Sequence, residues 1–306
     1  MSSTNYDYLV FSGGSIKGIA FLGALQVLLE YKIITSNMKG YAGTSAGSII
    51  ASLLSIGLTY DEIQKYMFDI DISKIPDDKI GFIRDTENFI KNYGVCKGNY
   101  LYKYLGNIIK TKCGNKDYTI RQLYDDTGVK LVIPVTDVNK KETVYLHPHN
   151  SVDAYKNIPI RLAVRMSTSV PFLFEPIKYN NSLFVDGGVI DNYPINVFDG
   201  EESELGSIDQ CLGLCKPNNK VLGLKLITKI EPNEWTEING VTNFGLQLID
   251  LFLTDNDRKS YTKINKKRTI NIMTESYCLT DFSMDMKRES DLINAGIRAA
   301  FEFIGC

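Results

Sequence analysis

One short stretch, Gly43-Thr44-Ser45-Ala46-Gly47, sets the architecture expected for this chain. It fits the pattern G-x-S-x-G, in which a tight turn between a strand and a helix lifts a serine hydroxyl clear of the sheet. Its two glycines, Gly43 and Gly47, let the backbone bend and pack closely. A short strand ending in Tyr41-Ala42 precedes the turn, and an apolar helix follows it. We therefore predict Ser45 as a nucleophile, against the alternative of an ordinary glycine-rich turn.

Another strand-turn-helix unit lies upstream in the chain. A short apolar strand, Tyr8 to Phe11, ends at a glycine-rich turn, and a helix from about Gly18 to Tyr31 follows. Because this helix is apolar on nearly all sides, we expect it to be buried. Two such units in succession are typical of a parallel sheet with covering helices, so the predicted fold class is α/β.

The upstream turn reads Gly13-Gly14-Ser15-Ile16-Lys17-Gly18. Backbone N–H groups at the start of a helix attract an anion, which can be an oxyanion or a phosphate. A phosphate-binding loop needs serine or threonine after the lysine, where Gly18 stands, and a dinucleotide site needs glycine in place of Ser15. We expect N–H groups of Gly13, Gly14 and Ser15 to form an oxyanion hole, with Lys17 and Gly18 supporting the turn. A dinucleotide site and a plain tight turn remain the alternatives.

A third turn, Asp186-Gly187-Gly188, follows a short strand from Leu183 to Val185. A carboxylate at such a position can accept the proton of a serine nucleophile. The structural alternative is an Asx-turn, in which the aspartate side chain only bonds its own backbone. On its own, the turn therefore leaves the role of Asp186 open.

The rest of the chain continues the α/β pattern. From Leu58 to about Thr127 it is helical in character, with a capping box at Thr119 and Gln122, and we expect an insertion or cap over the sheet. Further strands are predicted at Lys130–Val135, Thr143–Leu146, Val221–Ile227 and Thr269–Met273, and helices at Asp61–Met67, Asn99–Lys110, Pro159–Met166, Phe244–Leu253 and Asp291–Ile304. We expect one domain over residues 1–306.

Composition narrows the classes of protein. The 306 residues carry 34 basic and 36 acidic side chains, and the net charge of −2 gives no electrostatic case for nucleic acid. The longest nearly apolar run, Gly18 to Leu29, is shorter than the roughly 20 residues that span a bilayer. No signal peptide is recognisable. We expect a soluble, cytoplasmic protein that meets membranes only from the outside.

Six cysteines are dispersed along the chain: Cys96, Cys113, Cys211, Cys215, Cys278 and Cys306. A chain of this length needs no disulfide scaffold, so we expect reduced thiols. Cys211 and Cys215 have a C-x3-C spacing, but no second cysteine or histidine pair lies nearby to complete a zinc site. Neither a metal nor an organic cofactor is expected.

Together, the three turns resemble those of the patatin-like phospholipases, also called patatin-like lipid acyl hydrolases. The resemblance extends to the segment Met166 to Pro176 and to Asn192-Tyr193-Pro194, and so covers Tyr8 to Pro194. It implies a three-layer α/β/α fold and phospholipase A-type cleavage of fatty-acyl esters through a covalent acyl-serine intermediate. By this resemblance Ser45 is the nucleophile and Asp186 the base of a Ser–Asp dyad. Ser15 departs from the glycine and Lys17 from the arginine that are commoner in the family.

The histidine count bears on the mechanism. The chain has only His147 and His149, and both precede Asp186, whereas α/β-hydrolases order their triad as serine, acid, histidine. This order favours a carboxylate base. Two alternatives remain: an α/β-hydrolase-type esterase that uses His147 or His149, and an inactive lipid-binding or interaction module on the same fold. Exposed apolar residues near the site would allow peripheral contact with a lipid surface, and the alternative for each candidate is a place in the core; the candidates are Tyr60, Met67, Phe68, Phe82, Phe172 and Phe174.

Overall fold

The computed structural model describes residues 6–35, 37–77, 92–200, 216–228, 238, 240, 244–249, 251, 263–275 and 282–305. Ten strands are assigned among them: β1 (Tyr8–Phe11), β2 (Gly40–Gly43), β3 (Gly94–Cys96), β4 (Lys130–Asp137), β5 (Glu142–Leu146), β6 (Phe172–Phe174), β7 (Ile177–Tyr179), β8 (Ser182–Asp186), β9 (Val221–Thr228) and β10 (Thr269–Thr274). Eight of them form one sheet in the order β10-β9-β1-β2-β4-β8-β7, and β5 pairs with β4.

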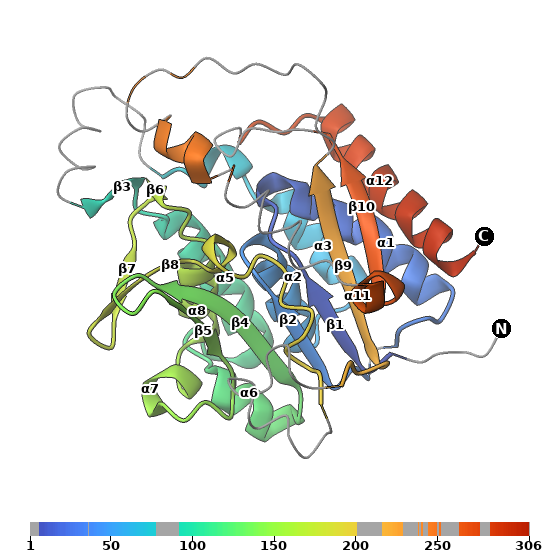
Figure 1. Cartoon of the computed structure of the whole chain (residues 1–306), viewed down its shortest axis with the longest axis horizontal. Helices are drawn as coiled ribbons and strands as arrows, with labels where there is room; N and C mark the ends of the chain where they lie inside the picture. Colours follow the sequence, from blue (N-terminus) through green and yellow to red (C-terminus); the bar gives the residue numbers. More distant parts are fainter. Residues whose placement is uncertain are drawn as a thin grey trace.

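The sheet is mixed but mainly parallel (Figure 1). Strands β10, β9, β1, β2 and β4 run parallel to one another, while β5 and β8 run antiparallel to β4. The predicted α/β class with a mainly parallel sheet is confirmed. The carboxyl ends of β1 and β2 carry the two glycine-rich turns, so parallel pairing of these strands brings both turns to one edge of the sheet.

Helices supply most of the packing. The α-helices are α1 (Ala20–Glu30), α2 (Ala46–Ser55), α3 (Tyr60–Asp69), α5 (Asn99–Cys113), α6 (Ile120–Thr127), α7 (Asp153–Lys156), α8 (Ile160–Ser167), α11 (Lys263–Lys267) and α12 (Met286–Ile304), and the 3-10 helices are η1 (Ser15–Ile19), η2 (Ile72–Lys74) and η3 (Gly187–Val189). Helices α1 and α12 lie side by side (Figure 1). Eight of the eleven residues of α1 are buried, as its apolar sequence predicts.

The two faces of β1 bury different cores. Leu9 and Phe11 join a large cluster that contains residues of α1, α2, α5, α8 and α12. Tyr8 and Val10, which alternate with them, join a smaller cluster whose cover includes Tyr193 and Phe198. Helices therefore pack on one face, and the chain that leaves the Asp186 turn packs on the other.

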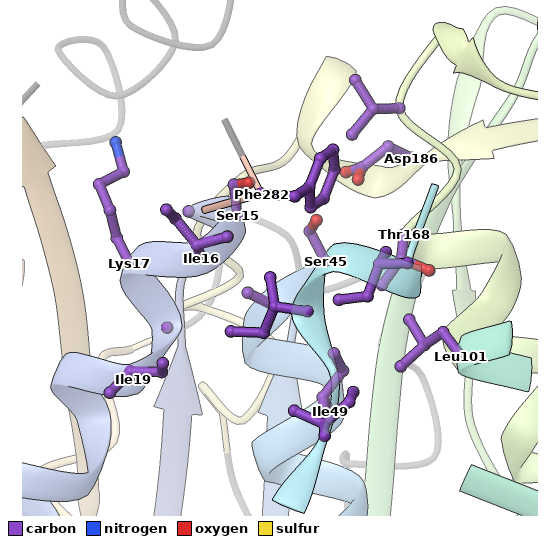
Figure 2. Close-up of a pocket in the computed structure, with 18 of the residues that line it drawn as sticks. Ser15, Ile16, Lys17, Ile19, Ser45, Ile49, Leu101, Thr168, Asp186 and Phe282 are labelled. Carbon is purple, nitrogen blue, oxygen red and sulfur yellow. The ribbon is translucent and has the colours of Figure 1, made fainter. Parts of the chain in front are cut away.

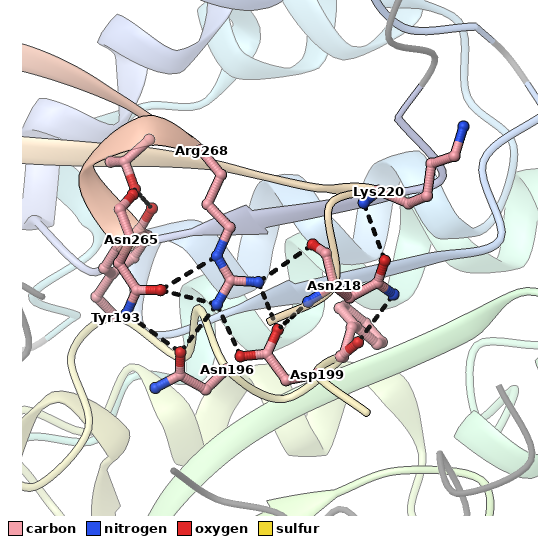
Figure 3. A network of polar contacts seen from close by, with 9 residues as sticks. Tyr193, Asn196, Asp199, Asn218, Lys220, Asn265 and Arg268 are labelled. Carbon is pink, nitrogen blue, oxygen red and sulfur yellow. Dashed lines mark hydrogen bonds and ion pairs between the residues drawn. The ribbon is translucent and has the colours of Figure 1, made fainter. Parts of the chain in front are cut away.

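A buried polar network holds the chain that packs on this second face of the sheet (Figure 3). The guanidinium of Arg268 forms two hydrogen bonds with the carboxylate of Asp199, and the same guanidinium donates to Asn196 Oδ1 at 3.0 Å. Asp199 Oδ1 also accepts the backbone N–H of Asn218 at 3.0 Å. Since both charged side chains are almost fully buried, the pair needs these additional bonds to offset desolvation. The network ties the chain after β8 to the start of β9 and β10.

The predicted insertion contains α3, α5, α6, η2 and the short strand β3. Thr59 and Glu62 form a capping box at the start of α3, and Thr119 with Gln122 confirm the predicted one at α6. Strand β3 pairs with β6 outside the main sheet. The carboxylate of Asp77 accepts backbone N–H groups at the start of α5, from Gly98 at 2.7 Å and from Asn99 and Tyr100. This cap fixes α5 to the end of the segment that contains η2.

Some sequence predictions fall outside the described residues: Cys211, Cys215, Cys278, Cys306 and Phe82. Cys96 and Cys113 carry free thiols. The predicted helix Phe244–Leu253 is described at 244–249 and 251. The terminal helix begins at Met286, five residues before the predicted Asp291, because Asp285 caps it through the N–H of Arg288. Within the described ranges, no helix is long and apolar enough to cross a membrane, and no cluster of three or more histidine, cysteine or acidic side chains could hold a metal ion.

Candidate active site

Ser45 occupies the sharp turn between β2 and α2. Its backbone has φ 51° and ψ −122°, in a region that residues other than glycine rarely adopt. The hydroxyl makes no capping hydrogen bond to α2, although the residue holds the N-cap position. Ser45 is 8% exposed and lines a pocket. The turn thus holds the hydroxyl away from the helix and presents it to the pocket.

The glycines of this turn allow the bend by close packing. A Cβ atom on Gly43 would lie 2.3 Å from the carbonyl oxygen of Gly47. A Cβ atom on Gly47 would lie 2.5 Å from the carbonyl oxygen of Ser12 and 2.7 Å from that of Phe11. Since all three neighbours are backbone atoms, no side-chain rotation could make room. Both positions require glycine for the reason that the sequence pattern indicates.

Asp186 ends β8 directly opposite this serine. The Ser45 hydroxyl and the Asp186 carboxylate face each other across the pocket (Figure 2). Oδ1 of Asp186 accepts the N–H of Gly188 at 2.7 Å, whereas Oδ2 is buried and has no hydrogen-bond partner among the described residues. Burial raises the pKa of the Asp186 carboxyl to about 7, and the Ser45 hydroxyl and the Gly188 N–H act in the opposite direction. The carboxyl is therefore balanced between its two protonation states near neutral pH.

The Gly13–Gly18 turn lies beside Ser45, and its donors are not equivalent. The N–H of Gly13, one of the three predicted oxyanion donors, donates to the carbonyl of Asn192 at 2.9 Å in this structure. The N–H groups of Gly14 and Ser15 have no acceptor among the residues described, and both residues line the pocket. Nζ of Lys17 donates to Oγ1 of Thr228 at 2.7 Å. Gly18 allows close contact with α2, since a Cβ there would lie 3.0 Å from Cβ of Ala46.

The chain after Asp186 links the two glycine turns. In addition to the bond from Gly13 to Asn192, the hydroxyl of Thr44 donates to the carbonyl of Asp191 at 3.0 Å. The Asp191 carboxylate in turn accepts the hydroxyl of Tyr145 at 2.7 Å. Burial raises the pKa of this carboxyl, against its hydrogen bonds. The segment that follows Asp186 is thus joined to both glycine turns by hydrogen bonds.

Ser167, at the end of α8, is a site residue that sequence reasoning did not identify. Its Oγ accepts the backbone N–H of Ser45 at 3.0 Å and donates to the carbonyl of Pro134 at 2.8 Å. Gly187 contacts the same carbonyl, since a Cβ there would lie 2.2 Å from Pro134 O. The only sequence signal for Ser167 is its place in the block Met166 to Pro176.

The two histidines lie elsewhere. Neither His147 nor His149 lines the pocket around Ser45. His147 is buried, neither of its ring nitrogens has a partner in the described parts of the chain, and burial lowers its pKa to about 4. The ring of His149 packs edge-on against Tyr124 of α6, with centroids 4.5 Å apart. No triad that uses either histidine is formed in this structure.

The pocket in front of Ser45 has mainly apolar walls. The space within the pocket and at its open mouth together amounts to about 1490 Å³. Of the apolar candidates from the sequence, Met67 and Phe174 line it. Phe172 packs against the cluster that contains Phe174, Tyr60 packs against the main core, and Phe68 is 40% exposed.

Comparisons with known proteins identify the family of this chain. A family model described as patatin-like phospholipase matches residues 9–199. An uncharacterized protein of Acanthamoeba polyphaga mimivirus is 30% identical over 305 residues, which cover 98% of this chain and 94% of that protein. A probable lipid hydrolase of Invertebrate iridescent virus 6 is 32% identical over 194 residues, which cover 63% of each chain.

The fold has a counterpart among solved structures. VipD from Legionella pneumophila matches with a TM-score of 0.62 and 19% identity, over 98% of this chain and 67% of that one. At this level of identity the likeness concerns the fold alone.

Proposed function

Since the chain belongs to the patatin-like phospholipase family, we propose that it is a phospholipase A-type lipid acyl hydrolase with Ser45 as nucleophile and Asp186 as base. One observation carries the proposal. The hydroxyl of Ser45 faces a buried carboxylate whose Oδ2 has no hydrogen-bond partner among the described residues, and both residues line an apolar pocket. Such an oxygen is available to take a proton.

Acylation begins with proton transfer. Oδ2 of Asp186 accepts the proton of the Ser45 hydroxyl while Oγ attacks the ester carbonyl carbon. The carbonyl oxygen gains negative charge, which the N–H groups of Gly14 and Ser15 and the N-terminus of α2 can stabilise. The tetrahedral intermediate then collapses, the alcohol takes the proton from Asp186, and an acyl-Ser45 ester remains.

Deacylation repeats these steps with water. Asp186 accepts a proton from the water molecule as its oxygen attacks the acyl carbonyl. Collapse of the second intermediate releases the fatty acid and returns the proton to Oγ of Ser45. A base with a pKa near 7 is suited to both directions of transfer at neutral pH.

The proposal includes peripheral contact with a lipid surface. Residues 244–249 and 251 are helical, and Phe244, Leu248 and Leu251 share one helical face, with exposed fractions of 52%, 37% and 63%. The opposite face packs against the pocket wall, where Leu246 joins the cluster of Phe174. An exposed apolar face on a helix that packs against this wall suits entry of substrate from a bilayer.

The decisive experiment combines labelling with hydrolysis. Wild type should react with a fluorophosphonate probe and hydrolyse phosphatidylcholine and p-nitrophenyl esters. Ser45→Ala should lose both activities, and Asp186→Asn should lose hydrolysis, each in a protein with an unchanged circular dichroism spectrum. A wild type that binds phosphatidylcholine vesicles but neither reacts nor hydrolyses would establish the binding-module alternative. Leu248→Ser should weaken sedimentation with these vesicles without changing hydrolysis of a soluble ester.

A further inference from the structure

Apolar side chains continue from Ser45 along one face of α2. Ser45, Ile49 and Leu53 are spaced four residues apart, and all three line the pocket. Figure 2 shows Ile49 below Ser45 along the helix. At a rise of about 1.5 Å per residue, the distance from Ser45 to Leu53 is about 12 Å.

Helix α5 presents a matching face. Leu101, Leu105 and Ile108 line the pocket at positions i, i+4 and i+7, which span about 10 Å. Leu101 lies beside the path from Ser45 to Ile49 (Figure 2). The two helices therefore supply facing apolar walls of similar length, and both walls begin near the nucleophile.

The far end of this space is closed. Leu53, Leu105 and Ile108 are only 1%, 2% and 3% exposed, so the surrounding core covers the pocket at that end. Helix α3 adds Tyr66 and Met67 to the wall, and Ile70, which directly follows this helix, adds another apolar side chain.

The walls offer little to a polar ligand. On α5 the one hydroxyl of the lining belongs to Tyr104, and it already donates to the carbonyl of Tyr66 at 2.7 Å. The lining residues of α2, α3 and α5 carry no charged side chain. A polar headgroup buried here would lose its hydration without gaining partners.

We propose that this blind channel between α2 and α5 binds the acyl chain of the ester and measures its length. The inference rests on the proposed function, since it places the acyl chain beside Ser45. A length of about 12 Å holds roughly nine or ten methylene groups, with C–C bonds of about 1.5 Å in a zigzag. Each buried methylene adds close to a fourfold gain in affinity, and methylenes beyond the closed end add none.

A series of p-nitrophenyl esters tests the length dependence. For wild type, kcat/KM should rise at least tenfold from butyrate to decanoate and gain nothing further at palmitate. A continued rise through palmitate would contradict a closed channel. A profile that stays flat from butyrate to palmitate would contradict an acyl site between these helices.

Two variants test whether the acyl chain lies between α2 and α5. Ile49→Phe places a ring about 6 Å from Ser45 along α2, one helical turn away, and should lower the decanoate-to-butyrate ratio of kcat/KM at least tenfold. Leu101→Phe narrows the channel from the opposite wall and should lower the same ratio, which keeps the test open if one variant does not fold. Leu54→Phe is the matched control, because Leu54 is on α2, packs against the core and does not line the pocket.

The outcomes separate the two proposals. If wild type hydrolyses no ester of any length, the proposed function fails. If wild type is active and Ser45→Ala is not, but Ile49→Phe and Leu101→Phe keep the wild-type ratio, only the channel is refuted.

Discussion

The backbone N–H of Ser45 donates to Oγ of Ser167 at 3.0 Å, and this oxygen in turn donates to the carbonyl of Pro134 at 2.8 Å. One hydroxyl therefore joins the nucleophile turn, the end of α8 and the strand β4. All the groups involved are buried, so the bridge has no water to compete with it. If Ser45 is the nucleophile, as proposed, Ser167 would act on the reaction through the backbone of Ser45, as a positioning residue.

We expect Ser167→Ala to lower kcat about tenfold with little change in KM. The substitution leaves the N–H of Ser45 and the carbonyl of Pro134 unpaired, which should lower the free energy of unfolding by about 1–3 kcal/mol. Steady-state kinetics and urea unfolding measure the two effects. Ser55→Ala, which removes another buried hydroxyl of this region, is the control and should keep wild-type kcat. An unchanged kcat in Ser167→Ala would show that the bridge has no part in positioning.

The rate of hydrolysis should depend on pH through Asp186. Only the deprotonated carboxylate can accept the serine proton, and burial raises its pKa to about 7. We expect kcat/KM on a soluble ester to fall tenfold per pH unit below about pH 6 and to level off above about pH 8. A pH profile between pH 4 and 9 measures the midpoint. A midpoint near pH 4 would mean that the base titrates as an exposed carboxyl does.

Asp186→Asn should stabilise the protein while it removes activity. Because the pKa in the folded state lies above the unfolded value of about 3.9, the folded protein binds this proton more tightly. Its contribution to stability is therefore largest below pH 4 and declines as pH rises to 7. The uncharged amide in Asp186→Asn avoids the cost of burying the deprotonated Asp186 carboxylate at high pH. The free energy of unfolding at pH 8 should therefore rise by at most about 4 kcal/mol. Urea unfolding at pH 8 and at pH 4.5 measures the difference, which should shrink at the lower pH.

The contribution of His147 to stability should depend on pH in the opposite sense to that of Asp186. Its folded-state pKa of about 4 lies below the unfolded value of about 6.5, so stability is lost as pH falls between these values. In wild type the contribution of Asp186 to the free energy of unfolding rises as pH falls through much of this interval, and this rise masks the loss from His147. Asp186→Asn should therefore lose stability more steeply towards acid than wild type does. His147→Ala, which lies away from the pocket, should keep most hydrolysis at pH 7.5; its loss would reopen the histidine mechanism.

Gly47→Ala should be far more damaging than Gly57→Ala. A Cβ at Gly47 meets two backbone carbonyl oxygens of the β1 end, and neither can move alone. We expect a loss of about 3 kcal/mol in unfolding free energy, together with loss of fluorophosphonate labelling. Gly57 has a φ of +79° but nothing within 4 Å of its Cβ position, so alanine there costs only about 1 kcal/mol of backbone strain. Equal melting temperatures for the two variants would contradict the packing argument.

The sequence predicted those parts of the site that local chemistry determines. Gly43, Ser45 and Gly47 form the expected turn, because the bend and the close packing are properties of the turn itself. Most strands and helices begin within a few residues of their predicted starts, since apolar runs and capping residues mark them. The assignment of Asp186 depended on the family resemblance, because D-G-G alone is also an ordinary Asx-turn.

The remaining features depend on contacts between distant parts of the chain. No sequence pattern shows that the carbonyl of Asn192 accepts the N–H of Gly13. Nor does any pattern show that Oγ of Ser167 accepts the N–H of Ser45. The position of β9 and β10 on the far side of β1 and the pairing of β3 with β6 also follow from long-range packing. Such pairings have no local signature, so they require a structure.

The bonds from Gly13 to Asn192 and from Thr44 to Asp191 have a consequence for biosynthesis. The nucleophile turn leaves the ribosome long before the segment that secures it. Closing contacts of this sequence separation is slow compared with forming the flanking helices. A nascent or partly refolded chain therefore carries Ser45 before the bonds that secure its turn have formed, and under the proposed mechanism it should not react. Recovery of fluorophosphonate labelling during refolding should lag behind recovery of helical signal, which makes the label a reporter of the last folding steps.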